Sequence, residues 1–450
     1  MQVPPHLPWD YILIKYFTDI GSTISVLRKG QDKMSKRKGR YEYTTPRNIK
    51  NREYTSYEDA PLKDYGYSDP PPQNLTKKFL KVFVILFISV VVVLALTNLD
   101  NLTSDNINHW FQYELLGKTE GGGYPVRFSG MSVDIGSFDV MDGCPVYCSD
   151  TSLVVLNSNA GEYLNAHHSF ASPIIKTGSG YSVVFNSGAT AYKLISRDSV
   201  IYSGTTDKKI FDADVAPNGT YALLTEGSDY LSELSVYKID NTKKFSYSFA
   251  EYYVNNVSVN RDGTKAALGG VSARNGGLIS AVYILDFGQD NYLQKYEFED
   301  SFIYSVEYLN NGNVIAVGSE AAYYIDVEKN KQTAFEYDMK TLTNYSFDSE
   351  YGAVLSLSSD ADGRSCDVFT ISSDGKKTNE TSINDKVLSL DYTNEKIAVL
   401  TSGKVTVYNL KGKELKSVDA DADSRKICFS DSDNIYVLGT SLISKLEIKD

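Results

Sequence analysis

The sequence predicts an all-β domain of the β-propeller class behind a single transmembrane helix. The composition, with 34 Tyr, 12 Pro and 5 Met among 450 residues, is typical of short strands joined by polar turns. One long apolar run near residue 80 indicates a membrane span. After Pro125, a pattern of short strands recurs about every 40 residues, which is the period of a propeller blade.

The membrane span is predicted from the run FLKVFVILFISVVVVLALT at positions 79–97. About twenty such residues cross a bilayer core, and Lys81 lies near one end, where it can reach the head groups. Lys77 and Lys78 precede the run, whereas the next basic residue after it is Lys118. This asymmetry predicts a helix over 77–98, with the N-terminus cytoplasmic and the larger part extracytoplasmic in the cell membrane. The preceding region is too long for a cleaved signal peptide.

The region before the span, 1–76, is predicted to be a disordered cytoplasmic tail. From Met34 to Asn74 it has almost no aliphatic residues, so it cannot bury enough apolar surface to fold. Residues 1–33 differ, and one explanation is that translation begins at Met34. The codons for Lys29-Gly30 would then resemble a bacterial ribosome-binding site.

Charge divides the chain into two parts. Up to Lys78 there are 14 Lys and Arg against 9 Asp and Glu, a net charge of +5, whereas the remainder has 31 against 48, a net charge of −17. An acidic domain of this kind repels nucleic acid and anionic lipid, so we expect no nucleic-acid partner.

A short stalk is expected over 99–124. Ile107, Trp110, Phe111 and Leu115 recur at helical spacing, which predicts a short amphipathic helix, and Gly121–Gly123 then form a flexible joint.

The repeats occupy 125–450, the predicted propeller. Each has a strand, a polar turn and a small-apolar strand, and the turns are centred on Gly180, Gly219, Gly263, Gly312, Gly352, Glu395 and Asn434. The spacings are 39, 44, 49, 40, 43 and 39 residues. A second turn signal in each repeat, as in LSVYKIDNTKK, is interpreted as the hairpin between a blade's second and third strands.

The two ends of the domain are predicted to close the ring in one composite blade. Two strands would come from the residues after Asn434 and two from VRFSGMSVDIGSFDVMDG, before Cys144. Together with seven intact blades this gives eight, and seven blades in total is the alternative.

Three segments give the chain a family resemblance: YPVRFSG (Tyr124–Gly130), SFASP (Ser169–Pro173) and VVFNSGATAYKL (Val183–Leu194). With the single span, they resemble an uncharacterised family of membrane-anchored propeller proteins from Gram-positive, clostridia-type bacteria. More distantly the repeats are similar to WD40-like and quinoprotein-like propellers, although they contain no WD dipeptide. The resemblance implies a fold and a topology but no activity.

No catalytic, cofactor or metal residues can be assigned from the sequence. Cys144, Cys148, Cys366 and Cys428 are interpreted as buried thiols, with a bridge between blades left open. The adjacent His167 and His168 would face opposite ways in a strand, and His6 and His109 lie outside the repeats.

Two acidic runs and two glycine pairs are candidate ligand sites. Asp360–Gly363 and Asp419–Ser424 partly copy a calcium loop but lack its later ligands, Ser430 standing where a Glu is needed, so we expect solvated turns. Gly269-Gly270 and Gly276-Gly277 are placed in a loop between strands that precedes no helix, so no phosphate site is expected.

The predicted function is a non-enzymatic binding or scaffold module for a protein or a cell-envelope polymer. The alternatives are a hydrolase or lyase acting on cell-wall polysaccharide through carboxylates at the channel, and a transmembrane sensor.

Overall fold

The computed structural model describes residues 121–450, apart from positions 361, 379, 395 and 450. The predicted tail, the predicted membrane span and nearly all of the predicted stalk lie outside the described residues. No helix in the described part has the length and apolar character that crossing a membrane requires.

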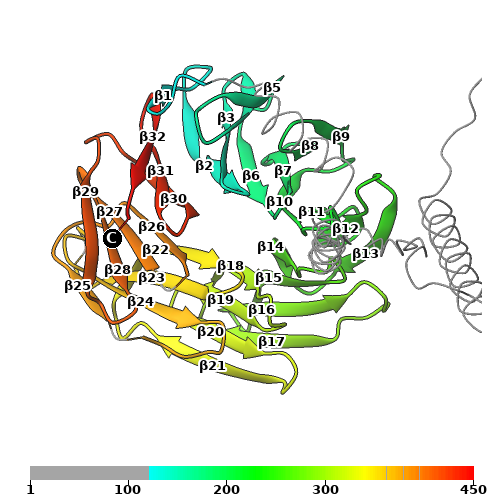
Figure 1. The fold of residues 1–450 in the computed structure, drawn as a ribbon. Helices are drawn as coiled ribbons and strands as arrows, with labels where there is room; N and C mark the ends of the chain where they lie inside the picture. The colour runs from blue at the N-terminus through cyan, green and yellow to red at the C-terminus, as the bar shows by residue number, and fades with distance from the viewer. Residues whose placement is uncertain (1–120, 361, 379, 395, 450) are drawn as a thin grey trace, which may run out of the picture. The chain divides into compact units, whose positions relative to one another are not determined.

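The described residues form eight four-stranded antiparallel sheets arranged as the blades of a propeller (Figure 1). The first four blades, innermost strand first, are β2 (Val133–Met141), β3 (Cys144–Ser149), β4 (Ser152–Leu156) and β5 (Glu162–His167); β6 (Pro173–Thr177), β7 (Tyr181–Asn186), β8 (Ala191–Ser196) and β9 (Val200–Thr205); β10 (Ile210–Val215), β11 (Tyr221–Glu226), β12 (Ser232–Tyr237) and β13 (Lys243–Phe249); and β14 (Tyr253–Val259), β15 (Lys265–Arg274), β16 (Gly277–Asp286) and β17 (Gln294–Glu299).

The other four blades complete the ring and confirm the predicted number of eight. They are β18 (Ile303–Tyr308), β19 (Val314–Gly318), β20 (Ala321–Asp326) and β21 (Lys331–Glu336); β22 (Thr341–Asp348), β23 (Gly352–Ser358), β24 (Cys366–Ser372) and β25 (Thr381–Ile383); β26 (Ser389–Thr393), β27 (Lys396–Thr401), β28 (Lys404–Asn409) and β29 (Glu414–Asp419); and β30 (Lys426–Asp431), β31 (Asn434–Leu438), β32 (Leu442–Glu447) and β1 (Val126–Arg127).

The ring does close through a composite blade, but the predicted two-plus-two composition is wrong. Three strands come from the C-terminal end and only β1 from the N-terminal end, where Val126 pairs with Ile443. The segment Val133–Met141 is instead the innermost strand of the first blade and pairs with β3. The turn at Gly143 (φ 74°) is therefore an eighth copy of the repeated turn, 37 residues before Gly180.

Two further details differ from the sequence interpretation. The second turn signal, as in LSVYKIDNTKK, joins the third strand to the fourth, since it links β12 to β13. Gly269-Gly270 lies within β15 and not in a loop. The side chain of Asn256 occupies the space above Gly269, where a Cβ atom would lie 2.5 Å from Asn256 Oδ1. Gly276 does form a turn, at φ 81°.

Alternation along the innermost strands separates the core from the channel. In β10, Ala213 is fully buried between blades, whereas Asp212 and Asp214 on either side of it belong to the opposite set of side chains. Each of the eight hydrophobic clusters is built from neighbouring blades, and all of their buried members lie between Phe128 and Ile448. This stretch therefore contains a complete core and its own ring closure, the properties of an independently folding domain.

The two faces of the propeller carry different connections. Turns between the first and second strands, and between the third and fourth, emerge on one face, which we call the acidic face for reasons given below. Turns between the second and third strands, and the connections from blade to blade, emerge on the other, which we call the aromatic face. The described chain begins at the acidic face, because Gly123 N–H donates to Asn159 O (3.0 Å) and Tyr124 Oη to Asn157 O (2.9 Å) in the turn after β4.

Candidate functional site: the acidic mouth of the channel

The strand registers place equivalent residues of the eight innermost strands in a ring of side chains on the channel side of the blades. In chain order this ring is Asp139, Lys176, Asp214, Ser258, Glu307, Ser346, Asp391 and Cys428. Seven of the eight are polar or charged, although neighbouring positions in the same strands are apolar. The channel wall is therefore polar by sequence pattern.

Several ring residues also fasten one blade to the next. Asp214 accepts a hydrogen bond from Val259 N–H (2.6 Å), and Asp391 accepts one from Phe429 N–H (2.7 Å). Ser258 Oγ accepts one from Tyr308 N–H (2.9 Å). A carboxylate held by backbone donors is fixed in direction, so these side chains form a rigid lining.

The channel opens at the acidic face into a cavity of about 650 Å³. Its lining comes from the first six blades and includes six carboxyl groups and one basic group. The carboxyl groups are Asp142, Asp214, Asp262, Glu307, Asp348 and Glu350, and the basic group is Arg261. A concave site with this imbalance concentrates cations, because its protein walls focus the field.

Below the cavity, Lys176 stands among acidic groups from two other blades. Its Nζ lies 3.8 Å from Asp212 Oδ1, and Asp214 and Glu307 also act on it electrostatically. Ser258 Oγ donates to Glu307 Oε2 at 3.3 Å. Water reaches the lysine, since 39% of its side chain is exposed, yet the channel wall surrounds the charge.

The environment shifts the protonation of these groups in a consistent direction. Burial, and secondly the charge of Asp214, raises the pKa of Glu307 to about 8, and burial raises the pKa of Asp214 to about 6. The carboxylate of Asp212 raises the pKa of Lys176, which therefore stays charged. At neutral pH the floor of the cavity thus carries a cation, an ionised Asp214 and a Glu307 that is mostly protonated.

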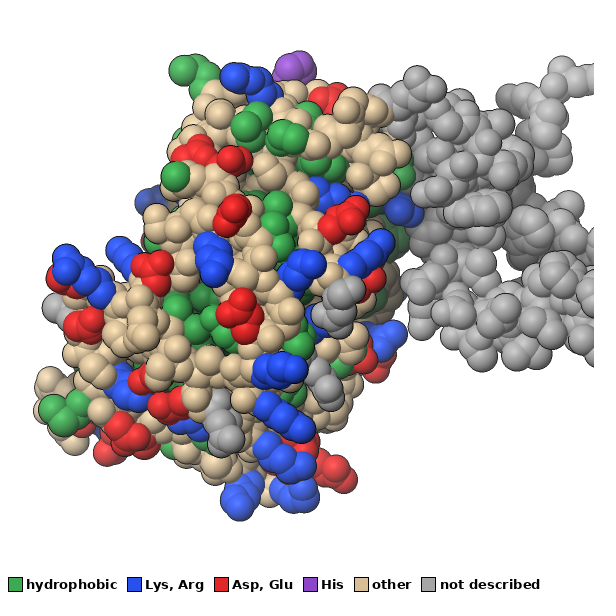
Figure 2. Space-filling model, turned by 60° about the vertical axis from the view of Figure 1, so that its left-hand side comes forward, with side chains coloured by type: hydrophobic (Ala, Val, Ile, Leu, Met, Phe, Trp, Pro, Cys, Tyr) green, Lys and Arg blue, Asp and Glu red, His purple; other side chains and the backbone are tan. Residues whose placement is uncertain are grey.

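The rim of the cavity is more open. Asp262 and Glu350 are exposed, and Asp348 accepts hydrogen bonds from the N–H groups of Glu350 (2.8 Å) and Tyr351 (3.1 Å). Burial raises the pKa of Asp348 and of Asp142. Elsewhere on the surface, as Figure 2 shows for one view, acidic and basic side chains are interspersed. The mouth, with six carboxyl groups and one arginine, lacks this mixture of charges.

The histidines and cysteines considered from the sequence lie away from this mouth. His167 ends β5 and is exposed, while His168 is half-buried and its Nδ1 accepts a hydrogen bond from Phe170 N–H (3.1 Å). His6 and His109 lie outside the described residues. All four cysteines lie in the described part and are buried, with no disulfide joining them. Cys144 and Cys148 share β3, and burial raises the pKa of Cys148 to about 12.

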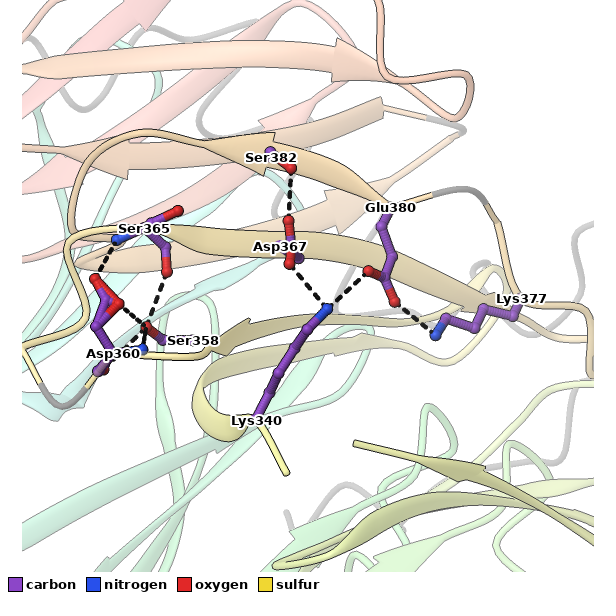
Figure 3. Close-up of polar contacts among 8 residues, drawn as sticks. All are labelled: Lys340, Ser358, Asp360, Ser365, Asp367, Lys377, Glu380 and Ser382. Atoms are coloured by element: carbon purple, nitrogen blue, oxygen red, sulfur yellow. Dashed lines mark hydrogen bonds and ion pairs between the residues drawn. The ribbon is translucent and has the colours of Figure 1, made fainter. Parts of the chain in front are cut away.

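The two acidic runs form turns. Asp360 accepts a hydrogen bond from Ser365 N–H (3.2 Å) beside Ser358, as Figure 3 shows. In the second run Asp423 accepts one from Thr440 N–H (2.9 Å), whereas Ser430 lies in β30 and donates to Gly143 O (3.0 Å).

Figure 3 also shows an ion-pair network on the same blade. Lys340 Nζ lies 2.9 Å from Asp367 Oδ2 and 3.0 Å from Glu380 Oε2, and Lys377 Nζ lies 2.9 Å from Glu380 Oε1. These four side chains neutralise one another and leave no unpaired carboxylate for a ligand. Among the described residues, no group of three or more His, Cys, Asp or Glu side chains is arranged to hold a metal ion.

No residue of the mouth was predicted as a site residue from the sequence. Its carboxyl groups come from five different blades, and no linear motif joins them. A weaker signal was present, because seven of the eight first strands have a polar or charged residue four to six positions before the turn residue. Aligning the turns would have matched Asp214 with Glu307, both five residues before the turn glycine, whereas Asp391 joins the ring only through the strand register.

Solved structures similar to this chain are propellers of very different sequence. The computationally designed Ika8 protein is 10% identical, with a TM-score of 0.52 over 73% of this chain and 99% of that one. The C-terminal WD40 domain of Sif2 is 11% identical, with a TM-score of 0.52 over the same shares. BamB from Moraxella catarrhalis is 10% identical, with a TM-score of 0.46 over 72% and 99%. These likenesses concern the fold alone.

Comparison with curated protein sequences finds no match. A family model described as "Family of unknown function (DUF5711)" matches residues 130–448, which is more than half of the chain and almost all of the described propeller. The protein therefore belongs to this family of unknown function.

Proposed function

We propose that the protein is a membrane-anchored, extracytoplasmic propeller that acts as a binding or scaffold module, and that its acidic mouth binds a basic segment of a partner protein. Propellers suit this role because rigid blades hold variable loops on one face. The membrane anchor and the extracytoplasmic location rest on the apolar run at 79–97 and on the distribution of Lys and Arg around it.

The observation that carries the proposal is the lining of the mouth. Six carboxyl groups and one arginine surround about 650 Å³, a volume in the range of ligand sites. Ammonium and guanidinium groups satisfy such a lining with charge-assisted hydrogen bonds. At the floor, the charge of Lys176 and the protonation of Glu307 reduce the repulsion between neighbouring carboxylates. The negative charge available to a ligand therefore lies on the exposed rim acids Asp262 and Glu350.

The mouth opens on the face where the described chain begins. Gly123 and Tyr124 are bonded to the turn after β4, on the acidic face. The described chain therefore enters the propeller on the same face as the mouth.

A tri-lysine peptide tests the proposal. We expect it to bind the 121–450 fragment at low salt, and the double variant Asp262→Asn/Glu350→Gln to raise its Kd at least about tenfold, because each lost charge contact contributes about 1 kcal/mol. Raising the salt concentration to screen the charges should weaken binding of the wild type in the same sense. Isothermal titration calorimetry measures both effects.

The matched control removes two negative charges elsewhere. Glu320 and Glu336 are exposed on the aromatic face, so Glu320→Gln/Glu336→Gln changes the net charge equally and should leave the Kd unchanged. Equal loss in both double variants would show that tri-lysine senses only the overall charge and would overturn the proposed site.

A second candidate is a hydrolase acting on cell-wall polysaccharide, and the pair Asp214 and Glu307 is the observation that favours it. The two carboxyl groups line one cavity with pKa values near 6 and 8, as a base and an acid require. This candidate predicts release of reducing ends from purified wall glycan with a maximum between about pH 6 and pH 8, lost at least about 100-fold in Glu307→Gln. Absence of release by the wild type between pH 5 and pH 9 would dismiss it.

A further inference from the structure

The aromatic face carries a second surface, which begins with a repeated β-bulge. In four consecutive blades the pairing of the innermost strand shifts at an equivalent place near this face. The extra residues are Phe211, Asn255, Tyr304 and Thr343. A bulge re-aims a side chain away from the ladder, and bulges occur preferentially beside binding sites.

The bulges help to form a crescent of exposed apolar side chains over the third, fourth and fifth blades. Phe211 lies against Tyr253 with ring centroids 5.0 Å apart. Of the ten large hydrophobic side chains exposed in the described part, five lie here: Tyr230, Leu231, Tyr253, Leu278 and Tyr304. We call these five with Phe211 the aromatic crescent. Half of the exposed large hydrophobic side chains thus gather on one face of three neighbouring blades, and such a concentration marks an interaction site better than scattered residues do.

The crescent is rigid at its centre. Strands β15 and β16 have ten residues each, against five to seven in the other second and third strands. Leu278 lies near the tip of this long hairpin, and Asp300 N–H donates to its carbonyl (2.9 Å). Arg274, on the opposite strand, makes two 3.0 Å hydrogen bonds to Glu297. A surface held in this way loses little conformational entropy on binding.

Charged groups around the crescent are mostly acidic. Glu226, Asp229, Glu299 and Asp300 are exposed there, whereas the exposed Glu251 is paired with Lys295 (3.0 Å). The exposed bases are Lys208 and Lys209, because the charge of Arg274 is paired with Glu297 (3.0 Å). The complementary ligand therefore has apolar side chains flanked by basic ones.

We infer that the aromatic crescent is a docking surface for a protein segment in which apolar residues are flanked by lysine or arginine. A protein fits better than a glycan because the aliphatic Leu231 and Leu278 offer neither a ring face nor a hydrogen bond to a sugar. Tyrosine and other large apolar residues are the usual anchors of protein interfaces. This surface lies opposite the acidic mouth, so the domain could hold two partners at once.

Two peptides of equal charge test the inference with the 121–450 fragment. One has phenylalanine and leucine between lysines, and the other has serine in their place. We expect the apolar peptide to bind at least about tenfold more tightly, and Tyr253→Ser/Tyr304→Ser to abolish that difference, since a few aromatic anchors supply most of the affinity of an interface. Fluorescence anisotropy of labelled peptides measures it.

The matched control is Tyr292→Ser, because Tyr292 is 41% exposed, like Tyr253 at 40%, but lies on the acidic face. It should retain the difference between the peptides, as should Asp262→Asn/Glu350→Gln, which separates this surface from the mouth. Equal binding of the two peptides, or a difference that survives Tyr253→Ser/Tyr304→Ser in a variant with an unchanged melting temperature, would overturn the inference. Competition by a neutral oligosaccharide at the same tyrosines would overturn it in favour of a glycan.

Discussion

Removing residues 121–131 from the 121–450 fragment is expected to lower its free energy of unfolding by about 3–5 kcal/mol, because it deletes the last strand of the composite blade and the buried ring of Phe128. Phe128 is 7% exposed and belongs to the cluster that joins the last blade to the first. Tyr124 lies against Tyr436, with ring centroids 5.2 Å apart. The loss also exposes the edge of β32. Urea unfolding followed by circular dichroism measures the change.

Point variants separate ring closure from simple shortening. Phe128→Ala should account for about 3 kcal/mol of the loss, since a buried aromatic side chain is removed. Arg127→Ala, at an exposed position of β1, should change the free energy of unfolding by less than about 0.5 kcal/mol. A shortened fragment as stable as the parent would mean that the ring closes without β1.

Replacing Lys176 by Met is expected to destabilise the domain by about 2 kcal/mol at pH 8, because the channel acids lose their cation. This loss is smaller than the cost of breaking a fully buried ion pair, because 39% of the lysine side chain is exposed to solvent. Lys193→Met is the matched control on the same blade, where Nζ only contacts Ser203 Oγ (3.0 Å) at the surface. It should cost less than about 0.5 kcal/mol.

The pH dependence of this effect has a definite sign. The folded-state pKa values of Asp214 and Glu307 are raised to about 6 and 8, so the fold binds their protons more tightly than the unfolded chain. Their contribution to stability is therefore lost as pH rises from about 4, the pKa in the unfolded chain, to about 8. The destabilisation by Lys176→Met should shrink at pH 5, and adding Asp212→Asn, which neutralises the carboxyl group nearest to Lys176 (3.8 Å), should restore part of it at pH 8. A loss that is independent of pH would contradict the assigned electrostatics.

The fold could largely be predicted because each blade repeats a local signal. Turn residues such as Gly219 and Gly312 need a positive φ, which few other residues adopt, and their spacing revealed the period. The composition of the closing blade could not be derived in the same way. Gly143 lies in the same kind of turn, but the strand before it was assigned to the wrong blade, and only its pairing with β3 decides this.

The mouth could not be predicted as a site because its chemistry is distributed. Asp142 and Glu350 are more than 200 residues apart and meet only when the ring closes. The raised pKa of Glu307 depends on burial, which the sequence does not show. The alternation within each innermost strand did contain the inward positions, but a ring of eight is visible only once the blades are in register.

The crescent on the aromatic face was missed for a different reason. Tyr253 and Tyr304 look like ordinary strand residues in a chain with 34 tyrosines. Bulges re-aim the innermost strands at this face, and a bulge depends on pairing with the next strand.

The proposed role as a receptor for positively charged groups is tested most directly by a structure of the 121–450 fragment solved with tri-lysine bound. We expect an ammonium group within hydrogen-bond distance of the Asp262 or Glu350 carboxylate, inside the mouth formed by the first six blades. A saturated complex with the peptide bound elsewhere and the mouth filled only by water would contradict the proposal.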